Sequence, residues 1–242
     1  NLVATTFGQQ NIKKGDEIII TELEHHSNYV PWHYLRETKG AIIKFAPINE
    51  DGDIIIDKFK ELISSRTKII AITHLSNVTG TIVPVKEIVE LAKKKNVPLH
   101  THLLESRVQA HQAKKVYGLT IPEHLQELGY LSHRASFAHS IWLTESDIEL
   151  LATNGCRVAH NPGSNLKLGS GIAPVRKYLD AGIPVGLGID GANSSDKGSI
   201  FHQAHLAAQI HNVRENDVEQ GLTPFEALRL ATWGGAAVML ME

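Results

Sequence analysis

Short apolar runs alternate with segments of helical spacing over the first hundred residues. The runs are rich in β-branched side chains, which is typical of strands buried on both faces of a parallel sheet. Helical spacing predicts helices over 31–38 and 57–64, and Pro84 is suited to the first position of a third helix. The predicted strands are 17–21, 41–45 and 68–72. This order of strands and helices indicates parallel βα units.

The rest of the chain keeps the alternation, but polar residues now stand at or near the strand ends. The strand candidates are 98–104, 135–139, 156–160 and 184–190. A helix is predicted to open at Thr144, because Asp147 three residues later completes a capping-box pattern. Further helices are predicted over 201–213 and 224–231, with loops at 161–165 and 190–198. Parallel α/β folds carry their sites at the carboxyl ends of the strands.

Charge and composition narrow the classes of partner. The 242 residues carry 24 basic and 26 acidic side chains, a balance that argues against a nucleic-acid partner. No apolar run approaches the roughly 20 residues of a membrane-spanning helix, and the start of the chain shows no signal-peptide pattern. We therefore expect no membrane partner. The lone Cys156 cannot form an internal disulfide, which fits a reducing, cytoplasmic setting. Assembly into a homo-oligomer stays open.

Histidine is the unusual residue type: ten of the 14 lie at or after position 100. His100 and His102 alternate along one predicted strand, so their side chains should point to the same side and could share a metal. Glu105, His139 and Asp190 follow at the ends of this and later strands. A hydrolytic zinc-type centre needs nitrogen and oxygen ligands and a group that moves protons, and these residues supply both. A histidine taken alone is more often a surface or hydrogen-bonded core residue, and it is the recurrence at consecutive strand ends that favours a site.

Residues 100–240 resemble the second half of an amidohydrolase-superfamily aminohydrolase, the branch of S-adenosylhomocysteine, guanine and hydroxyatrazine deaminases. The strings that carry the resemblance are HTHLLE, AHSIWL, VAHNPGSNLKLGSGIAP, GLGIDGANSS and ALRLATWGGA. The resemblance implies that His102 and Asp190 bind a divalent metal such as Zn²⁺ or Fe²⁺, with His100 a further candidate ligand. It implies that Glu105 shuttles protons and that His139 orients the water or the substrate. Candidate substrate-binding residues are Trp142, Ser164, Asn165 and Ser194.

The chain departs from this family in one important respect. The family's barrel has eight strands and opens with a separate H-x-H pair on its first strand, whereas this sequence supplies only the last four strands. Nothing before His100 provides such a pair. The metal site implied by the resemblance is therefore half built.

Residues 1–99 resemble a different family, the cysteine desulfurases and selenocysteine lyases of aminotransferase class V. The strings are NLVA, GDEIIITELEHHSNYVPW and RTKIIAITHLSNVTGTIVPVKEIVELA. By this resemblance His25 would stack on pyridoxal phosphate and Asn77 would bond its phenolic oxygen. The Schiff-base lysine, the phosphate loop and the persulfide cysteine have no counterpart, so we do not expect this cofactor to bind.

Together these observations predict an α/β protein of about seven parallel strands. A three-strand doubly wound segment, residues 1–99, is fused to a half (β/α) barrel, residues 100–242. The predicted function is metal-dependent hydrolytic deamination of a small heterocycle of purine, pyrimidine or triazine type, weakened or lost because the site is incomplete. The alternatives are a catalytically silent chimera, whether natural, engineered or an assembly artefact, and a remnant of a pyridoxal-phosphate desulfurase.

Overall fold

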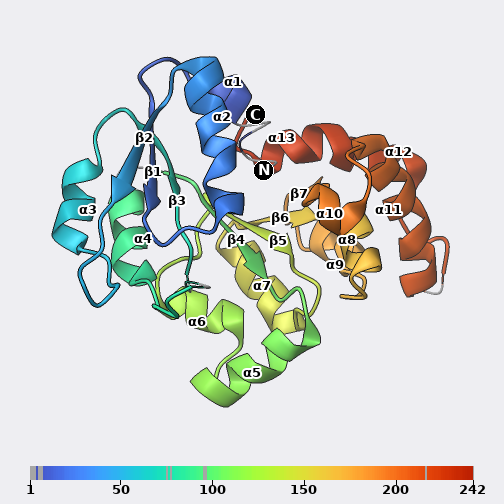
Figure 1. Ribbon diagram of the computed structural model, residues 1–242. Helices are drawn as coiled ribbons and strands as arrows, with labels where there is room; N and C mark the ends of the chain where they lie inside the picture. The colour runs from blue at the N-terminus through green and yellow to red at the C-terminus, as the bar shows by residue number, and fades with distance from the viewer. Residues whose placement is uncertain are drawn as a thin grey trace. The chain divides into compact units, whose positions relative to one another are not determined.

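The computed structural model describes residues 8–74, 78–94, 97–215 and 217–241, together with positions 4 and 76. The chain divides into two compact units, Asn1–Pro98 and Leu99–Glu242. Each unit is built on its own parallel sheet, one of three strands and one of four (Figure 1). The predicted fold class is confirmed.

The sheet of the first unit has the strand order β2-β1-β3. Its strands are β1 (Glu17–Thr21), β2 (Ile42–Ala46) and β3 (Thr67–Ala71). Its helices are α1 (Gln9–Asn11), the 3₁₀ turn η2 (His26–Asn28), α2 (Val30–Lys39), α3 (Ile56–Leu62) and α4 (Val85–Lys94). The strand bounds lie within one residue of those predicted from the apolar runs.

The central strand β1 is buried along its whole length because helices cover both faces of the sheet. Ile18 and Ile20 pack in one apolar cluster with Trp32 of α2. Ile19, between them, belongs to a second cluster with Phe59 of α3. Alternating side chains of one strand thus enter two cores, as in a doubly wound sheet.

The second unit has the strand order β4-β5-β6-β7. Its strands are β4 (Leu99–Leu103), β5 (Ala135–His139), β6 (Arg157–His160) and β7 (Val185–Leu187). Its helices are α5 (Arg107–Tyr117), α6 (Ile121–Glu127), α7 (Glu145–Thr153), α8 (Pro162–Lys167), α9 (Val175–Asp180), α10 (Ala192–Ser195), α11 (Ile200–Glu215), α12 (Pro224–Arg229), the π-helical turn η3 (Leu230–Gly234) and α13 (Gly235–Val238). The predicted capping box is present at Thr144, whose Oγ1 accepts the backbone N–H of Asp147.

Two segments that we predicted as loops contain short helices instead. Segment 161–165 enters α8 at Pro162, whose fixed φ suits the first helical position. Segment 190–198 contains α10, begun by amide N–H bonds from Ser194 and Ser195 to the Gly191 carbonyl. Among the described residues, no helix is long and apolar enough to cross a membrane.

Candidate metal centre

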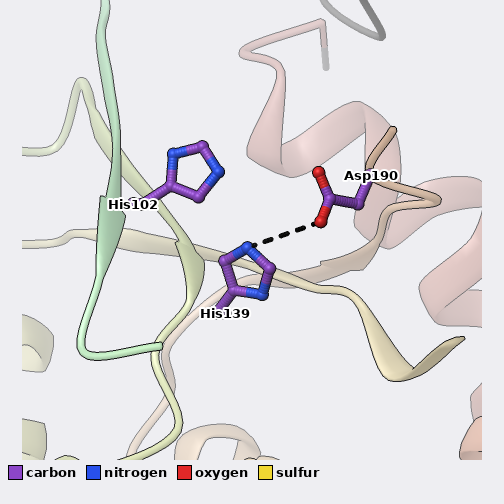
Figure 2. Close-up of side chains that lie close together, drawn as sticks. All are labelled: His102, His139 and Asp190. Atoms are coloured by element: carbon purple, nitrogen blue, oxygen red, sulfur yellow. Dashed lines mark ion pairs between the residues drawn. The ribbon is translucent and has the colours of Figure 1, made fainter. Parts of the chain in front are cut away.

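Three side chains of the second unit converge at the carboxyl ends of its strands. Each of His102, His139 and Asp190 offers a ligand atom, and these atoms all lie within 4.8 Å of one another. Figure 2 shows the three side chains directed into one space, His102 from β4, His139 from β5 and Asp190 from the segment after β7. Two imidazoles and a carboxylate are a donor set typical of zinc and related divalent cations.

The strands bring these residues together through their register. In the parallel β4–β5 pair, Leu103 lies opposite His139, so His102 comes one residue before the level of His139. The two rings stack with centroids 5.1 Å apart. Asp190 follows β7, three residues beyond the end of that strand. Side chains that are distant in the sequence therefore meet at one end of the sheet.

The backbone at this end of the sheet adopts left-handed conformations that non-glycine residues seldom use. The φ angles are 45° at Leu104, 66° at His139, 51° at Ser140 and 57° at Asp190. Each costs on the order of 1–2 kcal/mol. The strand ends carrying His139 and Asp190 are thus held away from their relaxed geometry, as is common at functional sites.

His139 is fully buried, and its two ring nitrogens have different surroundings. Nδ1 lies 2.8 Å from Oδ1 of Asn165. Nε2 is buried without a hydrogen-bond partner, 3.8 Å from Oδ2 of Asp190 and 4.0 Å from Oε2 of Glu105. A buried polar atom without a partner is costly in a folded protein, so a cation at this place would satisfy an orphaned nitrogen.

The charges around the cluster favour the forms that bind a cation. Burial alone would raise the pKa of Asp190, but hydrogen bonds from Ser164 and from the Gly191 amide, with the nearby histidines, lower it overall. His102 is accessible to solvent, yet partial desolvation by the protein around it and the neighbouring His139 lower its pKa. An ionised carboxylate and a neutral imidazole are the states in which these groups coordinate metals.

Glu105 lies beside the three converging residues, as the proton-carrying role would require. Its Oε2 faces His139, and its Oε1 accepts a long hydrogen bond of 3.5 Å from the Ser170 hydroxyl. Sequence reasoning did not single out Ser170, although it lies within the VAHNPGSNLKLGSGIAP string. Its contact with Glu105 spans 65 positions of the chain, which no local pattern reveals.

Three further candidates from the sequence, His100, Trp142 and Ser194, lie outside the group of converging ligand atoms. His100 is not among the three converging residues, and its Nδ1 lies 2.8 Å from the Ser136 hydroxyl. Trp142 carries the Arg107 guanidinium 4.5 Å above its ring and donates its indole N–H to the Ser170 carbonyl. Ser194 lies in α10 and donates its hydroxyl to the carbonyl of Gly191, the residue before that helix.

Ser164 and Asn165 both lie in α8 and have no exposed surface. Ser164 donates its hydroxyl to Oδ2 of Asp190 over 2.6 Å, and Asn165 contacts His139. In the first unit, His25 is exposed, its Nδ1 lies 2.9 Å from the Ser27 hydroxyl, and its ring is tilted by 40° against the His26 ring. Asn77 lies outside the described residues.

Comparison with known proteins finds two separate similarities, as the two sets of motifs predicted. The family model of aminotransferase class V matches residues 1–112. The cysteine desulfurase of Synechococcus elongatus is 50% identical over 94 residues, 39% of this chain and 15% of the relative. The 5-methylthioadenosine/S-adenosylhomocysteine deaminase of Caldanaerobacter subterraneus is 40% identical over 157 residues, 65% of this chain and 36% of the relative.

Comparison with solved structures finds a similarity to hydrolases. Triazine hydrolase from Arthobacter aurescens superposes with a TM-score of 0.66 at 26% identity, covering 88% of this chain and 52% of the enzyme. The chain spans about a third of the length of the deaminase relatives. It therefore joins a segment similar to class V aminotransferases to a segment similar to part of an amidohydrolase-type deaminase.

Proposed function

We propose that the second unit catalyses hydrolytic deamination of an amino-substituted heterocycle of the purine, pyrimidine or triazine type. The observation that carries this proposal is the convergence of His102, His139 and Asp190, with Glu105 beside them. The similarity to enzymes named as methylthioadenosine/S-adenosylhomocysteine deaminase and as triazine hydrolase supports the substrate class.

The donor set fits a divalent cation, with zinc or ferrous iron the preferred ions for two imidazoles and a carboxylate. Such an ion supplies Lewis acidity that lowers the pKa of a water molecule towards neutrality. His102, on the edge strand β4, and Asp190, after the other edge strand β7, would hold the ion, and His139 would offer its unpartnered Nε2. Bound there, the ion would place the attacking water beside Glu105.

Glu105 performs the proton transfer that deamination requires. Its carboxylate takes a proton from the attacking water and gives it to the departing amino nitrogen, which leaves as ammonia. The carboxylate is half-buried, so it reaches the site while remaining accessible to a substrate. Ser170 holds Oε1 and leaves Oε2 directed towards His139.

The substitution Glu105→Gln tests this role. We expect ammonia release from S-adenosylhomocysteine, guanine or an aminotriazine to be abolished, while the zinc content of the purified full chain stays unchanged. Glu149→Gln, at an exposed position on α7, is the matched control and should retain both activity and zinc. Turnover that survives in Glu105→Gln would contradict the proposal.

A catalytically silent fold is the second candidate, because the described residues bring only the three ligand atoms of His102, His139 and Asp190 together. Metal analysis separates the two: near-stoichiometric zinc or iron supports the enzyme, and protein purified in zinc-containing medium without bound metal supports the silent fold. The class V match of residues 1–112 gives pyridoxal phosphate a separate test. Visible absorbance of a bound aldimine would favour a desulfurase remnant.

A further inference from the structure

Helix α8 reaches the candidate metal centre through two adjacent side chains. Ser164 donates its hydroxyl to Oδ2 of Asp190 over 2.6 Å, and Oδ1 of Asn165 lies 2.8 Å from Nδ1 of His139. Both side chains are completely buried. Because they offer no surface to a substrate, their contacts with Asp190 and His139 are the interactions through which they can act on the site.

The contact between Asn165 and His139 defines the state of the histidine ring. The amide oxygen that faces Nδ1 can only accept hydrogen bonds, so this contact is a hydrogen bond only when Nδ1 of His139 carries the proton. In a neutral ring the other nitrogen, Nε2, then presents a lone pair. Nε2 is the buried atom without a partner that faces Asp190 and Glu105.

We propose that Asn165 is a positioning residue that fixes His139 as the Nδ1–H tautomer, so that Nε2 is directed as a lone pair at the cation. Ser164 acts in parallel by holding the Asp190 carboxylate in place. Two neighbouring residues of one short helix thereby orient His139 at the end of β5 and Asp190 in the segment after β7. The inference rests on the proposed function and adds to it the two residues that position the candidate ligands through hydrogen bonds.

The chemistry of metal sites makes this role consequential. A histidine ligand commonly donates its remaining N–H to an oxygen acceptor, which fixes the ring orientation and makes the ligand nitrogen more basic. Loss of such an acceptor typically lowers metal affinity by about 10- to 100-fold. A carboxylate in place of the amide is a stronger acceptor and preserves the tautomer.

The first test measures zinc affinity of the full chain by competition with a chelator. We expect Asn165→Leu to weaken zinc binding about 10- to 100-fold, and Asn165→Asp to bind zinc at least as tightly as the wild type. Asn154→Leu is the matched control, because the Asn154 amide bonds the Leu150 carbonyl and Gln126, away from the site. Equal affinities in the wild type and Asn165→Leu would overturn the inference and leave the proposed function standing.

The second test needs neither a variant nor a metal. Nitrogen-15 chemical shifts of the His139 ring in the metal-free protein report which nitrogen carries a proton. We expect Nδ1 to be protonated, and a neutral ring protonated only at Nε2 would overturn the inference even if zinc binds. Wild-type protein that shows the Nδ1 proton but takes up no zinc would instead overturn the proposed function and the cation-directing part of this inference, leaving the tautomer assignment.

Discussion

Each unit of the chain buries a polar cluster in its sheet, and the two clusters are built differently. In the first unit, the Glu17 carboxylate accepts hydrogen bonds from Lys44 over 2.7 Å, Ser64 over 2.6 Å and Arg66 over 2.9 Å. In the second unit, His139 Nε2 and the amide nitrogen of Asn165 are buried without partners. The first cluster is satisfied by the protein alone, whereas the second is not.

The position of each cluster matches this difference. Glu17 begins β1, at the amino end of its strand, where its partners neutralise the charge and hold the pKa of Glu17 down at about 2 despite its burial. The converging side chains of the second unit lie at the carboxyl ends of its strands, where parallel α/β folds carry function. A buried carboxylate that has its full set of partners needs no ligand, whereas buried polar atoms without partners can bind one.

Exchanging one residue in each cluster gives the largest expected contrast. His102→Ala should lower zinc affinity by at least about 100-fold, because it removes a direct ligand and not merely its support. Glu17→Gln should leave zinc affinity unchanged and lower the free energy of unfolding of the first unit by about 2 kcal/mol, because charged hydrogen bonds are lost. Chelator competition measures the first effect, and hydrogen exchange in β1–β3 of the full chain measures the second.

The contrast between the two clusters would be contradicted if each substitution had the effect expected of the other. A Glu17→Gln variant that loses zinc, or a His102→Ala variant that loses exchange protection throughout β4–β7 in the absence of metal, would show that the clusters do not differ in kind. His102 is exposed, so its removal leaves no large cavity in the core.

The next effect concerns pH, where the two units should lose stability in different windows. Burial, and then Arg214 and Arg176, lower the pKa of His211 from 6.5 to about 4. Burial, His211 and His139 also hold the pKa of His160 well below its ordinary value. The unfolded chain therefore takes up these protons first, so the second unit is stabilised above about pH 6.5 and loses that contribution as the pH falls towards 4.

Because of Glu17, we expect the first unit to lose stability in a lower pH range than the second unit. Its pKa is 4.5 ordinarily and about 2 in the fold, so its contribution is complete above pH 4.5 and is lost as the pH falls towards 2. Hydrogen exchange of the metal-free chain at pH 5 should show loosening of β4–β7 before β1–β3. His211→Leu should reduce the difference, and a first unit that loosens earlier would contradict these assignments.

The sequence predicted the strands better than the helices, for a reason visible in α5. That helix buries only Ala113 among its residues, so its apolar pattern is weak, whereas every residue of β5 is buried. The candidate ligands His102 and Asp190 could be singled out because strand ends and motif strings mark them. The link between Asn165 and His139 joins residues 26 positions apart and depends on how α8 packs, which no local pattern records.

The smallest expected effect compares two serine–carboxylate hydrogen bonds of equal length. Ser64 donates to Glu17 and Ser164 donates to Asp190, each over 2.6 Å. Ser64→Ala should lower the free energy of unfolding of the first unit by about 1 kcal/mol without affecting zinc. Ser164→Ala should weaken zinc binding several-fold, up to about 10-fold.

The reason for the asymmetry is the number of other partners that each carboxylate keeps. Glu17 without Ser64 remains bonded to Lys44 and Arg66, so its geometry persists and only the energy of one hydrogen bond is lost. Asp190 without Ser164 has lost the side-chain donor that fixes its rotamer, and a ligand that turns away from the site binds a cation less well. Equal losses of stability and unchanged zinc binding in the two variants would mean that Ser164, like Ser64, serves the fold alone.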